Sequence, residues 1–174
     1  VRDMFVFSCY TGLAYIDIFN LTKDQLSKGI DGNLWIITNR QKTGSTSNIP
    51  LLPVAEEIIK KYENHPVSSN SGKLLPVYTN QKVNEYLKTI AENCGINKKL
   101  TFHCARHTFA TTVTLGNNVS MESVSKMLGH KSIKTTQHYA KILDSKVSQD
   151  MGSLKLVLEK KNEVQKENDK KLGS

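Results

Sequence analysis

Arg106 and His103 stand three positions apart in a stretch of apolar residues at helical spacing, so both side chains project from one side of a helix. The apolar stripe of that helix consists of Phe102, Ala105, Phe109 and Val113. Arg106 falls at the edge of the stripe, so we expect its guanidinium to be partly desolvated and to need an anion. A phosphate would fit both side chains. The alternative is that Arg106 pairs with a carboxylate in the core and that His103 is a structural residue at the helix start.

Two further polar side chains follow a helix boundary. Gly129 ends one predicted helix, His130 comes directly after it, and the next helix begins two residues later. Tyr139 lies within that next helix and shares a face with Ile142 and Leu143. Considered alone, Tyr139 would be interpreted as a core tyrosine.

The composition indicates a polyanionic partner. The formal net charge is +8, and an excess of cations favours DNA, RNA or an anionic lipid surface. Only Arg2, Arg40 and Arg106 are arginines among the 24 basic residues, so a site that needs a bidentate, permanently charged group has three candidates. The three cysteines lack paired metal-ligand spacing, and we expect no disulfide framework, no metal site and no cofactor. No apolar run is long enough to span a membrane and the opening residues do not have the pattern of a signal peptide, which indicates a cytoplasmic protein.

The elements that must position these residues are mostly helices. Apolar spacing and capping residues predict helices from residue 1 to the Thr11-Gly12 break, around 16–19, from Pro53 to 62, from 80 or 84 to Gly95, and after Thr101, Ser120 and Ser132. Residues 34–37 and 48–51 are predicted to pair as antiparallel strands around the polar stretch 41–45, and residues 67–72 to form a polar loop. The predicted fold class is mainly α with one small antiparallel β-hairpin.

Three ordered motifs resemble those of the tyrosine recombinase, or phage integrase, family. They are the stretch from His103 through Arg106 to Ala110, then Leu128-Gly129-His130, then Thr136-Gln137-His138-Tyr139. Two upstream motifs extend the resemblance: Thr11-Gly12-Leu13 is similar to the family's first motif, and Lys42-Thr43-Gly44 to its catalytic-lysine hairpin. The resemblance covers residues 1–150 and is greatest to integrases of conjugative transposons and related mobile elements.

This resemblance implies the catalytic-domain fold of tyrosine recombinases and a site-specific recombinase or integrase that breaks and rejoins double-stranded DNA. Tyr139 would attack a backbone phosphorus, giving a 3′-phosphotyrosyl link and a free 5′-hydroxyl. Arg106 and His130 would bind the non-bridging oxygens as charge develops. Lys42 would protonate the leaving 5′-oxygen, and His103 would assist proton transfer from the tyrosine. The covalent link conserves the energy of the phosphodiester, so this chemistry requires neither ATP nor a metal.

One position departs from the family pattern. Ala14 stands where the family has an arginine, although Asp17, which resembles the acidic residue that braces that arginine, is present. Either the protein is inactive, or the residue has been mutated, or another arginine reaches the same phosphate. We prefer Arg2 as the substitute, because its helix runs into the turn before Ala14. Arg40 lies in the hairpin and is expected to contact the DNA backbone.

The resemblance also suggests how the chain is organised. We expect residues 1–150 to form a catalytic domain with a truncated start and an absent N-terminal DNA-binding module. Residues 151–174 would form a short amphipathic helix followed by a disordered tail. That helix would dock either on a neighbouring protomer or on its own chain. The protein would be bacterial and DNA-associated, a tetramer on DNA in the synaptic complex, and the isolated domain could be a monomer. Two other functions remain open: a DNA-binding module that has lost catalysis, suggested by Ala14, and a type IB topoisomerase-like enzyme.

Overall fold

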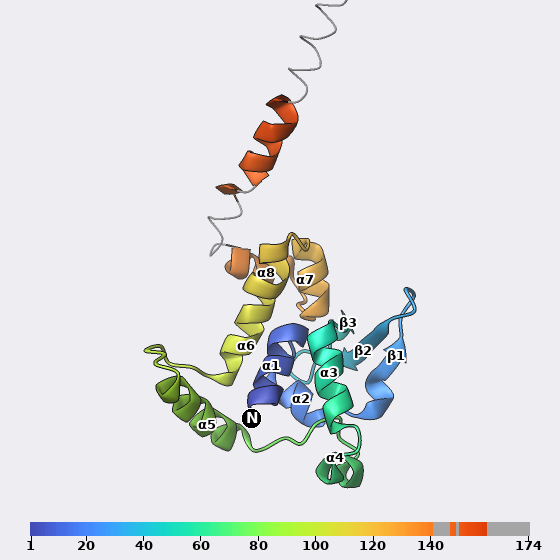
Figure 1. Cartoon of the computed structure of the whole chain (residues 1–174). Helices are drawn as coiled ribbons and strands as arrows, with labels where there is room; N and C mark the ends of the chain where they lie inside the picture. Colours follow the sequence, from blue (N-terminus) through green and yellow to red (C-terminus); the bar gives the residue numbers. More distant parts are fainter. Residues whose placement is uncertain (141–146, 149, 160–174) are drawn as a thin grey trace, which may run out of the picture. The chain divides into compact units, whose positions relative to one another are not determined.

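The computed structural model describes residues 1–140, 147–148 and 150–159 (Figure 1). The chain divides into two units, Val1–Ala140 and Lys141–Ser174. In the second unit, residues 150–159 are helical, where the short amphipathic helix was predicted. Ile142, Leu143 and the predicted tail lie outside the described residues. None of the helices in the described part of the chain is long and apolar enough to cross a membrane.

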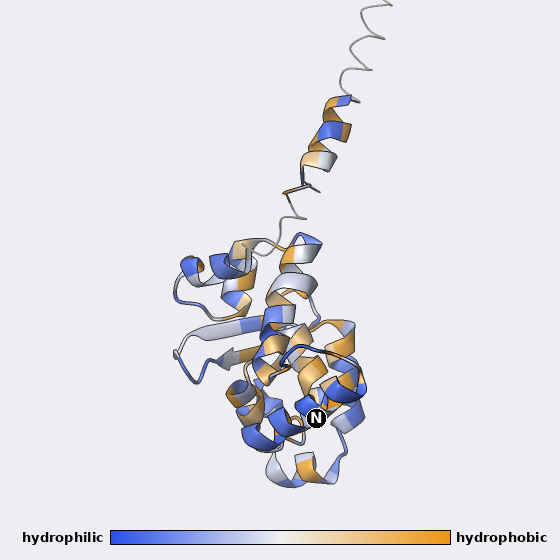
Figure 2. Ribbon diagram, turned by 90° about the vertical axis from the view of Figure 1, so that its left-hand side faces the viewer, coloured by the Kyte–Doolittle hydropathy of each residue, from blue (hydrophilic) through white to orange (hydrophobic). Residues whose placement is uncertain are grey.

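Helix α1 (Arg2–Thr11) lies at the centre of the first unit. It buries Met4 and Phe7 and packs against α3 (Pro53–Tyr62) and α6 (Phe102–Thr108). Figure 2 shows apolar segments, in orange, gathered in the middle of this unit. The predicted break is confirmed, because α1 ends at Gly12, whose φ of 69° is a left-handed conformation that glycine adopts without strain.

A three-stranded antiparallel sheet lies beside these helices, with strand order β1-β2-β3 (Figure 1). The predicted hairpin is confirmed as β2 (Leu34–Asn39) and β3 (Thr46–Pro50), in which the fully buried Ile36 and Ile49 are directly paired. Strand β1 (Leu26–Lys28) was not predicted, because three residues are too few to show a period of two. The turn between β2 and β3 carries Lys42.

The remaining helices follow the predicted order, with two differences. They are α2 (Tyr15–Asn20), α5 (Asn80–Asn93), α7 (Met121–Met127) and α8 (Ile133–Ala140), with short 3-10 turns η1 (Lys23–Gln25) and η3 (Leu115–Asn117). The predicted loop at 67–72 is wrong: α4 (Pro66–Ser71) forms there, because Pro66 suits a first helical position and the His65 side chain accepts the Val67 N–H. The helix after Thr101 also changes to a π-helical stretch, η2 (Phe109–Thr114), beyond α6.

Candidate active site

Arg106 projects from α6 into a buried position and is held there by neutral groups. Its Nη1 donates to the Gly12 carbonyl at 2.6 Å and its Nη2 to the Leu128 carbonyl at 2.8 Å, while His130 Nε2 lies 3.1 Å from Nη2. The residue is only 5% exposed. Among the described residues no carboxylate forms an ion pair with it, so the interpretation of Arg106 as half of a core ion pair is wrong. The guanidinium keeps a positive charge that a bound anion could neutralise.

Two glycine turns make this arrangement possible. A Cβ at Gly12 would collide with Phe109 and with Leu128, so only glycine allows the end of α1 to approach α6 closely enough for its carbonyl to reach Arg106. Gly129 has a φ of 61°, and a Cβ there would lie 2.6 Å from Arg40 Cγ. Both turns therefore bring backbone against the arginines of the site.

His130 is held in one tautomer by its two neighbours. Its Nε2 faces Arg106 Nη2, which can only donate a hydrogen bond, so Nε2 must accept. In a neutral imidazole the other nitrogen then carries the proton, and His130 Nδ1 donates to Thr136 Oγ1 at 2.8 Å. The opposite tautomer would place two N–H groups against each other. Thr136 lies on α8 and is completely buried.

Tyr139, also on α8, lies among imidazole rings. Its ring is 5.0 Å from that of His107 at an angle of 67°, and 6.2 Å from that of His130 in a parallel arrangement. His107 in turn pairs edge-to-face with His103 at 4.8 Å. Tyr139 is 7% exposed, so it is buried as a core tyrosine would be, but its neighbours are groups that bind and move protons.

Arg2 lies outside the cluster, which consists of Arg106, His103, His107, His130 and Tyr139. The structure therefore does not support our choice of Arg2 as the substitute for the missing arginine. Arg2 begins α1, whereas the cluster gathers at the other end of that helix, about 15 Å away at 1.5 Å per residue. Its Nε pairs instead with Asp3 at 2.9 Å, and its side chain is 77% exposed. The arginine that approaches the cluster is Arg40.

Arg40 follows β2 and is buried against the residue that was expected to brace the missing arginine. Its Nε lies 3.0 Å from Asp17 Oδ2, and the two side chains are 8% and 1% exposed. Asp17 also accepts the backbone N–H groups of Gln41 and Ala14. In the described part of the chain, Arg40 Nη1 is buried without a hydrogen-bond partner. It is therefore an unsatisfied donor, and because this atom is shielded from solvent, an anion can bind it only when neighbouring side chains move.

The charges of these groups perturb one another. Burial, assisted by the charges of Arg106 and Arg40, lowers the pKa of His130 to about 4, so its ring is neutral at pH 7. Burial and the charge of Arg40 lower the pKa of Arg106 to about 10, an effect that Tyr139 partly offsets. Two guanidiniums are thus held close enough to repel each other, and a phosphate between them would relieve that repulsion.

His103 and Lys42 lie at the more open side of the cluster, and both are exposed. Burial of part of the ring, followed by the charges of His107 and Arg106, lowers the pKa of His103, and the charge of Lys42 contributes to the same effect. His103 is therefore neutral at pH 7 and able to accept a proton. The structure brings Lys42 close enough for its charge to act on His103, and no hydrogen bond or ion pair joins Lys42 to these side chains among the described residues.

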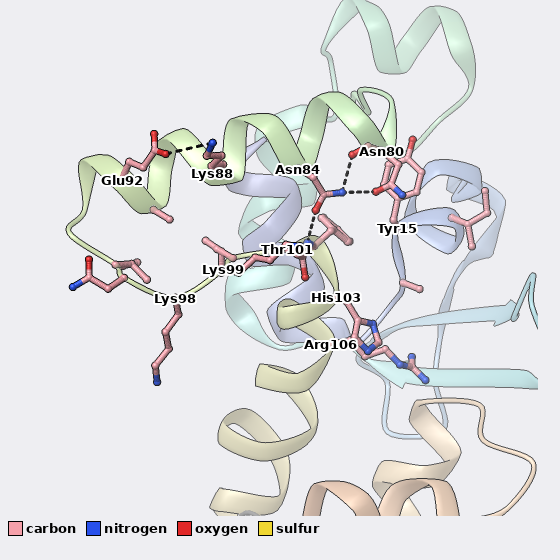
Figure 3. Close-up of a pocket in the computed structure, with 17 residues that line it drawn as sticks. Tyr15, Asn80, Asn84, Lys88, Glu92, Lys98, Lys99, Thr101, His103 and Arg106 are labelled. Carbon is pink, nitrogen blue, oxygen red and sulfur yellow. Dashed lines mark hydrogen bonds and ion pairs between the residues drawn. The ribbon is translucent and has the colours of Figure 1, made fainter.

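A pocket of about 1110 Å³ opens beside Ala14, His103 and Arg106 (Figure 3). It extends between α5 and the segment that leads into α6, and Figure 3 shows His103 and Arg106 together at one end of it. Lys88, Lys98 and Lys99 also line this pocket. Among the described residues, no three His, Cys, Asp or Glu side chains are grouped so that they could hold a metal ion.

Three residues in or next to the cluster were not identified as site residues from the sequence: Arg40, Thr136 and His107. Arg40 was considered and placed second, because the packing of the hairpin against the Gly129 turn cannot be inferred from local spacing. Thr136 could have been identified from its spacing, because it lies three residues before Tyr139 and therefore on the same face of that helix. His107 showed no local pattern of a site residue, and the structure places its ring against that of Tyr139.

Comparison with known proteins gives consistent matches. The model of the phage integrase family matches residues 2–146. The tyrosine recombinase XerC of Rickettsia canadensis is 31% identical over 142 residues, which cover 75% of this chain and 43% of the relative. XerD of Halalkalibacterium halodurans is 34% identical over 113 residues, covering 57% of this chain and 36% of the relative. The chain thus spans less than half the length of these relatives.

Solved structures with the same fold include several recombinases. XerA recombinase superposes with a TM-score of 0.68 at 20% identity, covering 87% of this chain and 61% of that one. XerH bound to its difH substrate after cleavage gives a TM-score of 0.67 at 18% identity, with 86% and 44% covered. The Tn1549 transposon integrase in complex with a circular intermediate DNA gives 0.61 at 17% identity, with 79% and 52% covered.

Proposed function

The chain belongs to the phage integrase family, and we propose that it is the catalytic part of a site-specific recombinase that cuts and rejoins double-stranded DNA through Tyr139. The observation that carries this proposal is the position of Arg106. A buried guanidinium held by two carbonyls and a neutral imidazole lacks the negative charge that would ordinarily accompany it. A phosphate placed next to Tyr139 would supply that charge.

In the proposed reaction the phenol oxygen of Tyr139 attacks a backbone phosphorus of DNA. A P–O bond to the tyrosine forms, the P–O5′ bond breaks, and the phenol proton passes to a base. His103, whose lowered pKa leaves it neutral, is the candidate base. Lys42, in the hairpin turn, would deliver a proton to the leaving 5′-oxygen. Rejoining is the reverse sequence with a new 5′-hydroxyl, so the energy of the phosphodiester is retained in the covalent intermediate.

We further propose that Arg40, and not Arg2, replaces the arginine that is absent at Ala14. Arg40 is braced by Asp17, the acidic residue expected to brace the missing group, and its Nη1 is an unsatisfied donor in the described part of the site. Two guanidiniums would then hold the non-bridging oxygens as charge builds on them. This assignment removes the main argument for a degenerate DNA-binding module, because the second cation is present.

Double-stranded DNA is the proposed partner. The net charge of +8 and the lysines that line the pocket beside the cluster would attract a DNA backbone. Structures of similar fold contain DNA, among them XerH and the Tn1549 integrase. XerH is a site-specific recombinase and the Tn1549 protein is an integrase. This similarity favours strand exchange over the relaxation of supercoils by a topoisomerase-like enzyme.

The organisation of the whole protein is also a proposal. Residues 1–150 would form the catalytic domain, acting together with an N-terminal DNA-binding module. Met151, Leu154 and Leu158 recur on one side of the helix at 150–159. We propose that this side docks on a neighbouring protomer of a tetramer assembled on DNA.

A nicked DNA substrate would test the function, if the nick is placed so that cleavage releases a short fragment with a free 5′-hydroxyl. We expect a covalent protein–DNA adduct with the parent chain and none with Tyr139→Phe, whose DNA affinity should stay within about twofold of the parent because only one oxygen is lost. Binding without any adduct in the parent would favour the degenerate module. An adduct of undiminished yield in the phenylalanine variant would exclude Tyr139 as the nucleophile.

A further inference from the structure

Thr136 connects the nucleophile helix to the phosphate-binding side of the site. It lies on α8 three residues before Tyr139, so the two side chains project from the same face of that helix. Its hydroxyl oxygen lies 2.8 Å from His130 Nδ1, and the residue is completely buried. His130 Nε2, at the other end of the same ring, faces Arg106 at 3.1 Å. A single imidazole therefore joins the helix of the nucleophile to the buried guanidinium.

We propose that Thr136 is a positioning residue for the reaction: its hydroxyl accepts the Nδ1–H of His130 and thereby presents Nε2, without a proton, toward Arg106 and the phosphate site. The inference rests on the proposed function for its catalytic consequence, but its structural part does not. The same bond fixes the place of His130 relative to Tyr139, because Thr136 and Tyr139 belong to one short helix.

The hydrogen-bonding roles follow by elimination. Arg106 has only donors, so the tautomer with a proton on Nε2 would oppose two N–H groups 3.1 Å apart. If a phosphate oxygen comes between Arg106 and His130, both can donate to it: His130 then carries a proton on Nε2 and gives up its direct contact with Arg106, while Nδ1–H still donates to Thr136. Thr136 is thus the acceptor in both protonation states. It holds the ring plane unchanged while the charge on His130 changes.

Valine at position 136 has nearly the shape of threonine but cannot accept a hydrogen bond, so it removes this restraint with little change in packing. We expect Thr136→Val to slow cleavage of a nicked substrate by about 10- to 100-fold, the usual cost of removing a partner that orients a functional histidine. DNA affinity should stay within about twofold. Thr136→Ser, which restores the hydroxyl, should recover most of the rate. Thr135→Val is the matched control, because Thr135 is an exposed threonine on the same helix.

Nitrogen NMR of the imidazole rings gives a readout that does not depend on DNA or activity. The chain has five histidines, and the signals of His130 can be assigned by their loss in His130→Gln. In the parent chain we expect Nδ1 to carry the proton and Nε2 to be unprotonated. Thr136→Val should shift this balance toward the opposite tautomer or a mixture, whereas the serine and Thr135→Val variants should resemble the parent.

The outcomes separate the inference from the proposed function. A parent chain with the proton of His130 on Nε2 would overturn the inference whether or not the valine variant folds. A valine variant that cleaves within about twofold of the parent would overturn its catalytic part. If the parent forms no adduct at all, the proposed function fails, while the tautomer measurement still decides the structural part.

Discussion

Arg40→Ala is the substitution that most directly tests the proposed site, because it would remove two separate interactions of the Arg40 side chain. The first is its ion pair with Asp17, in which both side chains are nearly inaccessible to solvent. Removing one partner of a buried pair commonly costs about 3–5 kcal/mol of unfolding free energy. Asp17 keeps two backbone N–H donors, from Gln41 and Ala14, so we expect a loss of about 3 kcal/mol.

The second interaction is with the phosphate. Loss of one preorganised donor to a developing oxyanion reduces catalysis by about 10²- to 10³-fold, and we expect Arg40→Ala to slow cleavage by at least this factor. The stability loss can be separated from this effect by combining Arg40→Ala with Asp17→Asn. The neutral amide no longer needs a cation, although it can accept only one of the two backbone N–H groups, so the double variant should regain a part of the stability and none of the cleavage rate.

The assay is single-turnover formation of the covalent adduct on a nicked substrate, at a temperature where urea titration shows each variant to be folded. Low concentrations of guanidinium ion should partly restore adduct formation by Arg40→Ala, because the ion can occupy the vacated space between Asp17 and the phosphate. Arg2→Ala is the control, since Arg2 is exposed and pairs with Asp3. Its cleavage rate should stay within about twofold of the parent.

The opposite pattern would refute this assignment. If Arg40→Ala cleaves within a few-fold of the parent once folded, Arg40 is a structural partner of Asp17 and does not act on the phosphate. If Arg2→Ala loses the activity instead, the helix that carries Arg2 must move when DNA binds.

Three further predictions concern other residues in and around the site. The pKa of His130 in the fold, about 4, lies below its ordinary 6.5, so the unfolded chain takes up its proton first as pH falls. Between pH 6.5 and pH 4 the fold should therefore lose about 3 kcal/mol of unfolding free energy that is fully present above pH 6.5. Urea titrations of His130→Gln should show a flatter pH profile. Gly129→Ala should destabilise the fold by about 2–4 kcal/mol, through its positive φ and its collision with Arg40, whereas Gly95→Ala, with a similar φ and open space, should cost about 1 kcal/mol in thermal unfolding. His107→Ala should slow adduct formation by about 3- to 10-fold by removing the ring beside Tyr139, and His107→Phe should restore the rate unless the imidazole acts through its nitrogens.

The parts of the site that could be predicted from the sequence are those with local spacing. His103 and Arg106 share a helix, and the cap and glycine signals correctly located the boundaries around His130 and Tyr139. The hairpin with Lys42 in its turn was predictable for the same reason, because alternating residues and turn residues are local features. The motifs that carry the resemblance to the family are local features as well, and the family model matches residues 2–146.

The contacts between elements could not be obtained in this way. Arg2 was favoured because its helix runs into the Gly12 turn, but a helix of ten residues separates its two ends by about 15 Å. Arg40 was placed second because nothing in the local pattern shows that the base of the hairpin packs against Gly129. The π-helical stretch after α6 was missed for a related reason, because the apolar spacing of these residues fits an ordinary α-helix equally well.

The proposed role of Arg40 would account for a site that lacks an arginine at position 14 and keeps its charge. The proposed chemistry requires two guanidiniums around one phosphate. The helix, strand or loop from which each guanidinium projects does not matter for this chemistry. Asp17 defines the place of the second guanidinium, because its carboxylate is buried, is aligned by the backbone N–H groups of Gln41 and Ala14, and still needs a cation. Arg40 meets that need from the sheet side, where the absence of a side chain at Gly129 leaves room for its stem. On the proposed assignment, Ala14 is compatible with catalysis, because the carboxylate that would brace an arginine there binds Arg40, which follows β2.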